Sequence, residues 1–233
     1  MVKSVISILF IFFVLTLFGQ EEKVWMEANE GQWEEEVLHK IKLDAGEMFI
    51  TNTGMTFHFH TGLHSHHETH HDENGSDFKG HVIRATFLGS QFIGSPYNTD
   101  ESAFYSNYYI GNDQAKWKSF VRSYHKTELD DFYQGIKMVY DGDYGNLKYS
   151  FTVAPFVDAS VIQSKIEGGD KIEILKNGDL KIHHSFGTIT EESPSAWQII
   201  DGKKKEVKVK FKLENSILSY ELGGYDNNYE WII

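Results

Sequence analysis

The chain has 233 residues, of which 40% are hydrophobic and 15% aromatic, so it holds enough apolar material for a folded core and is not disordered. Its formal net charge of −12 opposes binding to nucleic acids and to anionic membranes, because their phosphates would repel it. Cysteine is absent, which excludes disulfides, thiolate zinc sites and thiol nucleophiles.

The first twenty residues predict a signal peptide. Lys3 supplies a positive charge, and residues 5–18 form an apolar run that has the length of a signal-peptide core but is short for a membrane span. Cleavage after Gly19 or Gln20 would leave a mature chain, residues 21–233, without a membrane span. We therefore expect an exported protein that crosses the periplasm and is extracellular or held at the cell surface. A retained anchor is the alternative, although no stop-transfer pattern follows.

The rest of the chain has the patterning of short β-strands. Apolar and polar residues alternate over residues 55–60 and again over 147–153, which is typical of half-buried strands. Asn177-Gly178 lies between two further apolar runs and predicts a hairpin. Helix is expected only as short turns near residues 32–39 and 112–118. We predict an all-β fold, an antiparallel β-sandwich-like domain with few short helical turns.

A short internal sequence repeat is compatible with a second arrangement. Residues 46–50, followed by Gly54, resemble residues 178–182, followed by Gly187. Each segment predicts a strand, a turn at the second glycine and a returning strand. This repeat is compatible with two related β lobes in place of one domain.

A histidine-rich segment, residues 61–77, is the most tempting site for metal chemistry. Residues 67–71 satisfy the H-E-x-x-H pattern of zinc proteases, but their flanks lack the apolar periodicity of a buried helix. We therefore predict a mobile loop between two strands, without a cofactor. Neutral imidazoles beside carboxylates also suit Zn, Ni or Cu, so metal binding is the alternative. The candidate ligands are His64, His66, His67, His70 and His71.

Other signs of catalysis are weaker. The chain has no G-x-S-x-G, P-loop or G-x-G-x-x-G motif, so acyl-transfer and nucleotide chemistry lack their usual signatures. With 34 Asp and Glu residues, carboxylate pairs are inevitable, so a glycoside hydrolase remains an alternative. A metal-dependent hydrolase that uses the histidine-rich segment is the other enzymatic alternative. No catalytic residue is assigned.

Residues 107–117 predict a structural block in the middle of the domain. We expect Tyr108 or Tyr109 and Ile110 to enter the core, Gly111 to make a tight turn, and Trp117 to pack back over that turn. The alternative is a ligand platform made by the same aromatic residues.

Six short blocks, in this order, resemble those of a known family. They are residues 29–33 (Asn-Glu-Gly-Gln-Trp), 80–87, 107–117, 133–136, 147–151 and 194–198. Together they resemble, over residues 27–233, the N-terminal domain of large secreted or cell-surface proteins of gliding, Bacteroidetes-type bacteria. Phe156-Val157-Asp158 and Trp197 depart from its usual residues.

The resemblance implies a non-enzymatic module followed in its parent protein by β-propeller-type repeats, immunoglobulin-like or PKD-like domains, and a gliding-motility-associated C-terminal sorting domain for type IX secretion. It implies a role in adhesion or surface assembly, with partners among the downstream domains of the same protein and surface glycans or proteins. A carbohydrate-binding or carbohydrate-processing module is the first alternative, and it predicts an exposed groove lined by aromatic residues and acids. Metal binding through the histidine-rich loop is the second.

Overall fold

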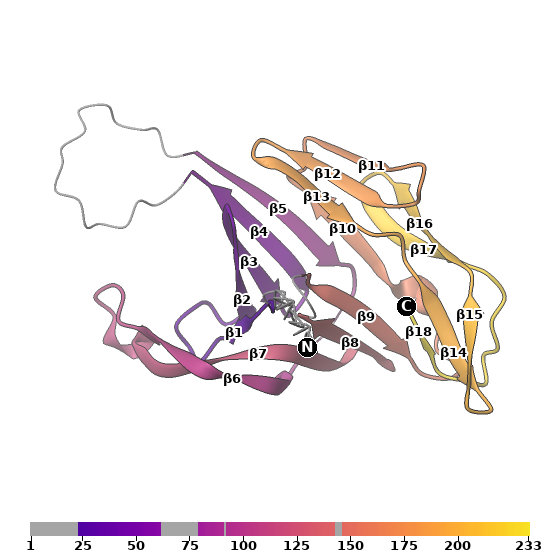
Figure 1. Cartoon of the computed structure of the whole chain (residues 1–233), viewed down its shortest axis with the longest axis horizontal. Coiled ribbons are helices and arrows are strands. Elements are labelled where there is room, and N and C mark those ends of the chain that lie inside the picture. Colours follow the sequence, from indigo (N-terminus) through magenta and orange to yellow (C-terminus); the bar gives the residue numbers. More distant parts are fainter. Residues whose placement is uncertain (1–22, 62–78, 91, 143–145) are drawn as a thin grey trace, which may run out of the picture.

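The computed structural model describes residues 23–61, 79–90, 92–142 and 146–233 (Figure 1). Within these ranges the regular secondary structure is almost entirely β-strand, with two 3₁₀ turns and no α-helix. None of the helical turns in the described ranges is long and apolar enough to cross a membrane.

The strands are β1 (Met26–Ala28), β2 (Val37–Leu43), β3 (Gly46–Thr51), β4 (Gly54–His60), β5 (Gly80–Phe87), β6 (Tyr97–Tyr108), β7 (Lys118–Tyr133), β8 (Ile136–Asp141), β9 (Lys148–Val153), β10 (Gln163–Glu167), β11 (Lys171–Ile174), β12 (Leu180–His184), β13 (Gly187–Glu191), β14 (Ala196–Ile200), β15 (Lys203–Val207), β16 (Val209–Glu214), β17 (Ile217–Leu222) and β18 (Trp231–Ile232). The 3₁₀ turns are η1 (Gln114–Lys116) and η2 (Ala159–Val161).

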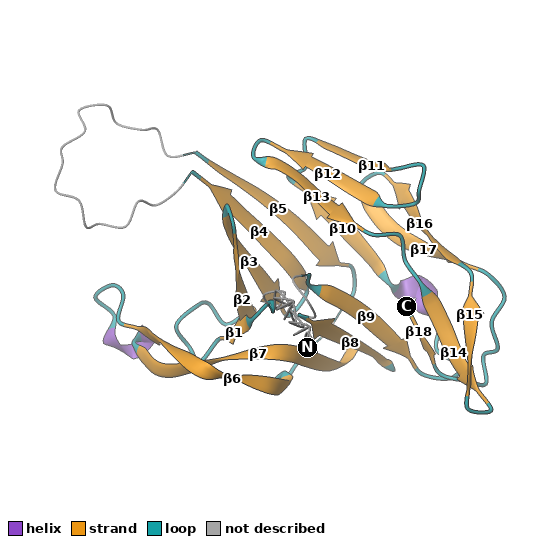
Figure 2. Ribbon diagram, viewed as in Figure 1, coloured by secondary structure: helices purple, strands orange, loops and turns teal. Residues whose placement is uncertain are grey.

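Fifteen strands form one antiparallel sheet, in the order β15-β14-β18-β9-β8-β7-β1-β2-β3-β4-β5-β10-β17-β16, with β6 paired to β7. The 16-residue strand β7 connects the two halves of this sheet: its residues 126–133 pair with β8, whereas Ser123 and Tyr124 pair with β1. The two arms of the sheet leave β7 in different directions and face each other (Figure 2). The sheet is therefore nearly closed and barrel-like.

The predicted antiparallel all-β fold is confirmed, and the sandwich-like packing is corrected to a single curled sheet. The alternative of two related lobes is also wrong. Both segments of the repeat do form a strand and a returning strand, β3–β4 and β12–β13. However, β10 pairs with β5 and β18 pairs with β9, so early and late parts of the chain build the same sheet.

The main core lies between the two arms. Phe87 of β5 makes edge-to-face contacts with Phe132 of β7 and Phe151 of β9, each at 5.4 Å between ring centroids. The last strand adds Trp231, which is only 1% exposed and packs on Tyr225 with ring centroids 4.9 Å apart. The alternation predicted for residues 55–60 and 147–153 places Met55 and Phe151 in this core.

A second, smaller core lies beneath the three-stranded sheet β11-β12-β13. Leu180 and Ile182 of β12 form one buried cluster with residues of the large sheet that include Phe59, Ile83 and Phe211. The predicted turn at Asn177-Gly178 joins β11 to β12, with Gly178 at φ +95°. The small sheet therefore covers the part of the large sheet that the first core does not fill.

The helical turn expected over residues 32–39 is wrong. Asn29 holds this segment as a loop: its Oδ1 accepts hydrogen bonds from the N–H groups of Gly31 (3.0 Å) and Trp33 (3.2 Å), and its Nδ2 donates to the carbonyls of Glu34 (2.9 Å) and Val37 (2.8 Å). These bonds use backbone groups that a helix would pair internally. The chain then enters β2 directly at Val37.

The second expected helical turn is confirmed as η1. Asp113 caps it, since its Oδ1 accepts a hydrogen bond from the N–H of Ala115 at 3.0 Å. The lysine run 203–205 follows a turn at Asp201-Gly202 and lies in β15 at one end of the large sheet. Lysines on a terminal strand oppose pairing with another chain.

Candidate functional site

The five histidines predicted as metal ligands, His64, His66, His67, His70 and His71, lie outside the described residues. The structure describes only the two ends of their loop, where the N–H of Thr61 donates to the carbonyl of Lys79 at 2.9 Å. Metal binding by this loop stays a prediction. In the ranges that the structure describes, no three His, Asp or Glu side chains come together as a metal site.

The paired strands β1–β5 present a continuous solvent side, which we call the outer face. It exists because these strands alternate: Met48 and Ile50 of β3 point into the core, whereas Glu47, Phe49 and Thr51 point outward. The outer face comprises the outward side chains of Glu27, Lys40, Lys42, Glu47, Phe49, Thr51, Thr56, His58, Arg84 and Thr86.

A row of aromatic rings crosses the outer face. Tyr108 meets Trp33 edge-to-face at 5.3 Å, Trp33 meets Phe49 at 6.4 Å, and Phe49 meets His58 at 6.3 Å. The loop held by Asn29 places Trp33 in this row. Such edge-to-face contacts fix ring orientation beyond what apolar burial alone does.

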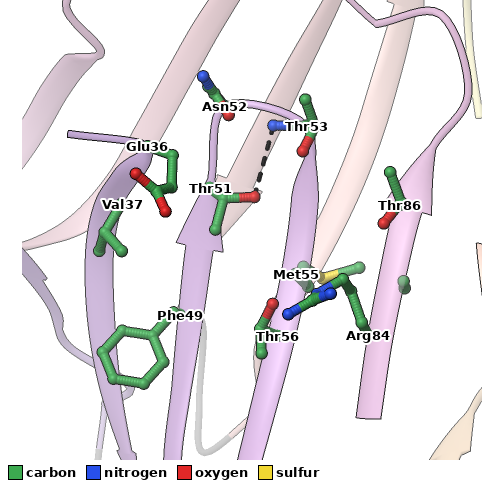
Figure 3. Close-up of a pocket in the computed structure, with 11 residues that line it drawn as sticks. Glu36, Val37, Phe49, Thr51, Asn52, Thr53, Met55, Thr56, Arg84 and Thr86 are labelled. Atoms are coloured by element: carbon green, nitrogen blue, oxygen red, sulfur yellow. Dashed lines mark hydrogen bonds between the residues drawn. The ribbon is translucent and has the colours of Figure 1, made fainter. Parts of the chain in front are cut away.

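An open hollow of about 430 Å³ lies on one side of the row (Figure 3). Phe49, Thr56 and Arg84 come from three neighbouring strands and are cross-strand partners in this hollow. Thr51 and Glu36 also line it, and the figure shows Glu36 and Arg84 on opposite sides. The hollow therefore combines an aromatic wall, hydroxyl groups and one charge of each sign.

A second open hollow, of about 500 Å³, lies over β1–β4. Lys40 lines it and also lies over the rings of Trp33 and Tyr108, at 4.8 and 5.0 Å from their centroids. Because Phe49 lines the first hollow and Lys40 the second, the aromatic row lies between them. The second hollow is lined by Trp25, Glu27, Lys40, Lys42, Leu43, Asp44, Gly46, Glu47, His60 and Ser123.

Hydrogen bonds fix the charged groups of the second hollow. Tyr108 donates to Oε2 of Glu27 at 2.7 Å, and Nζ of Lys40 donates to the Tyr108 hydroxyl at 2.6 Å. Burial, and then the Glu27 carboxylate, raise the pKa of Tyr108, so its hydroxyl stays a donor at all ordinary pH values. Glu47 pairs with His60 at 3.1 Å. The carboxylates here are thus held in place by neighbours.

The β6–β7 hairpin carries a second notable surface, and here the prediction for residues 107–117 needs correction. Trp117 does pack over the turn, since its Nε1 donates to the carbonyl of Gly111 at 3.2 Å and its ring meets Tyr109 edge-to-face. The block does not enter the core, because Tyr109 and Ile110 are exposed and Trp117 is 38% exposed. The hairpin projects from the sheet, so its tip has no second layer to pack against (Figure 1).

This geometry sets the expected cost of truncating Trp117. We expect Trp117→Ala to lower the free energy of unfolding by about 1 kcal/mol, because the half-exposed ring gains only part of the stabilisation of a buried aromatic side chain. Urea denaturation followed by fluorescence measures the change. A loss of about 3 kcal/mol or more would show that the ring belongs to the core after all.

Two buried ionisable groups gave no recognisable sequence signal. Glu191, the last residue of β13, accepts a hydrogen bond from the Tyr149 hydroxyl of β9, and burial raises the pKa of Glu191 to about 7. His39 of β2 is fully buried; its Nε2 bonds to Oδ1 of Asn98 at 3.0 Å, and burial lowers its pKa to about 4. His39 is therefore uncharged near neutral pH, whereas Glu191 is about half protonated at pH 7. Only non-local packing places them in the interior.

A family described as a domain of unknown function (DUF7948) matches residues 26–233 of this chain. No curated protein and no solved structure matches it.

Proposed function

The chain belongs to this family of unknown function, and from that starting point we propose that it is a non-catalytic binding module of a larger exported protein, acting in adhesion or assembly at the cell surface. The signal-peptide pattern of residues 1–20 supports export. The resemblance to N-terminal domains of Bacteroidetes-type surface proteins supports a parent protein with downstream domains and type IX secretion. No catalytic residue and no cofactor is part of this proposal.

The observation that carries the proposal is the aromatic surface of the β6–β7 hairpin. Phe104 is 82% exposed and Phe120 is 63% exposed, and Tyr105 contacts Phe120 at 4.7 Å between ring centroids. Tyr97 and Tyr109 on the same hairpin are exposed as well. Several exposed aromatic side chains on one hairpin are typical of an interaction site, where aromatic residues are enriched.

The hairpin geometry favours a protein partner. Strand β6 pairs only with β7 in the part of the chain that the structure describes, so its second edge has no neighbouring strand. An edge strand offers main-chain donors and acceptors to a strand of another protein. Aromatic side chains beside that edge would add contact area with little loss of conformational entropy. The proposed partner is therefore a protein of the cell exterior.

The experiment is a cell-binding assay with the labelled mature chain, residues 21–233, and the cells that produce it. We expect Phe120→Asn to lower retention on cells at least tenfold without changing the melting temperature, because the side chain is exposed and asparagine tolerates its φ of +61°. Phe156→Asn is the matched control, since Phe156 lies away from the hairpin in the loop after β9, is 77% exposed and has φ +64°. It should bind as the wild type does.

Protease treatment of the cells identifies the partner class. Loss of retention after treatment supports a protein partner, and unchanged retention would contradict it. Equal binding by Phe120→Asn and the wild type would reject the hairpin as the contact surface.

A further inference from the structure

We propose that the outer face of β1–β5 binds a neutral oligosaccharide, with sugar rings seated in the two hollows on either side of the aromatic row. This inference rests on the proposed role as a binding module, but it uses a surface separate from the aromatic tip of the β6–β7 hairpin. It identifies a ligand class and a site for the carbohydrate-binding alternative.

The first argument is the pairing of an aromatic wall with polar groups in each hollow. Phe49 lines the first hollow and Trp25 the second. Sugar rings present C–H groups on their faces and hydroxyls on their edges, so an aromatic ring can pack on the face while polar side chains bond to the edge. Both hollows, about 430 and 500 Å³, have the volume of small-ligand sites.

The second argument is charge. The first hollow holds Glu36 and Arg84, one charge of each sign. In the second, Lys40 lies 3.6 Å from Glu27, and Glu47 contacts His60. With charges of both signs interspersed, neither hollow creates the strong single-sign field that would attract an ionic ligand. The same groups remain donors and acceptors for hydroxyls, as do the threonines at 51, 53, 56 and 86.

The third argument excludes a peptide strand as the ligand of this face. Strands β2, β3, β4 and β5 each have paired neighbours on both edges, so their main-chain groups are already used. A ligand on the outer face must therefore be recognised by side chains alone. Flat, hydroxyl-rich rings fit a surface of aromatic and short polar side chains better than an extended peptide does.

The test is affinity electrophoresis of the mature chain, residues 21–233, through gels that contain soluble β-glucan, xylan, mannan, dextran or, as an anionic polymer, alginate. We expect retardation by at least one neutral polysaccharide. Phe49→Ala and Trp25→Ala should each reduce the apparent affinity at least tenfold. Phe120→Asn on the hairpin should leave the retardation unchanged.

Melting temperatures of all three variants test whether the fold is intact. If Phe49→Ala lowers the melting temperature strongly, Arg84→Ala replaces it, because Arg84 lines the same hollow and is an exposed outward residue of β5. Retardation by alginate alone would overturn the neutral ligand. Absence of retardation by every neutral polymer, or unchanged retardation of the outer-face variants, would overturn the site.

The two proposals fail in different ways. If no neutral polysaccharide retards the wild type but Phe120→Asn still lowers retention on cells, the outer-face site is rejected and the hairpin function stands. Cell retention that is unaffected by Phe120→Asn but lost with Phe49→Ala would reject the hairpin and keep the sugar site.

Discussion

Replacing Trp231 by alanine is expected to lower the free energy of unfolding by about 3–5 kcal/mol, the range measured when large buried aromatic side chains are truncated. Trp231 is almost fully buried in the main core and lies in β18, which pairs with β9 on one edge and with β14 on the other. The substitution therefore opens a cavity at the strand that connects β14 and β15 to the rest of the sheet. Urea denaturation of the purified mature chain measures the loss.

Trp117→Ala is the matched control for this prediction, because it removes the same side chain from a half-exposed position and is expected to cost about 1 kcal/mol. If Trp231→Ala does not fold, Trp231→Phe serves instead and should still lose more stability than Trp117→Ala. Equal losses at the two positions would contradict the burial of Trp231.

Opposite pH dependences are expected from the two buried ionisable groups. The pKa of Glu191 is raised to about 7 in the folded chain, from about 4.5 in the unfolded chain, so its stabilising contribution is complete below pH 4.5 and is lost as the pH rises through 7. The pKa of His39 is lowered to about 4, from about 6.5, so its contribution is complete above pH 6.5 and is lost as the pH falls through 4. Each amounts to about 3 kcal/mol, since one pKa unit corresponds to about 1.4 kcal/mol.

Between pH 4.5 and 6.5 the opposite pH dependences of these two contributions cancel, and single variants separate them. Glu191→Gln keeps an acceptor for Tyr149 and should gain stability relative to the wild type as the pH rises from 4.5 to 7. His39→Gln keeps a donor for Asn98 and should gain stability relative to the wild type as the pH falls from 6.5 to 4. Urea midpoints at half-unit pH steps give these differences, in which the other carboxylates cancel. A constant difference between Glu191→Gln and the wild type would show that Glu191 ionises normally in the folded chain.

Local patterns were sufficient for much of the fold. Alternation predicted β4 and β9, Asn177-Gly178 predicted a hairpin turn, and a short helical turn was expected near residues 112–118, where η1 lies. These features depend on neighbours in the sequence, which a single chain displays directly.

The remainder depends on partners far away in the sequence. The helical turn expected at residues 32–39 does not form, because the Asn29 side chain is hydrogen-bonded to backbone groups of that segment. Tyr109 and Ile110 were expected in the core because large apolar residues are usually buried, but the hairpin that carries them projects away from the sheet. The single curled sheet was missed because β7 pairs with different strands along its two halves, a division that its sequence does not mark.

The candidate site shows the same division. Alternation in β4 indicated that Thr56 and His58 face away from the core, so the sequence predicted which side chains of this strand belong to the outer face. It could not show that Trp33, Phe49 and Tyr108 meet, because Tyr108 reaches them only through the pairing of β6 with β7 and of β7 with β1.

The positions of the first and last strands also determine when the protein can fold. Strand β1 lies between β7 and β2, and it pairs with residues roughly a hundred positions later; strand β18 lies between β9 and β14. Neither strand is at an edge, so β14 and β15 join the rest of the large sheet only once β18 has been synthesised and has paired with both neighbours. Such non-local pairing slows folding. The nascent chain would therefore remain extended for longer, which suits the passage through a secretion channel that we propose.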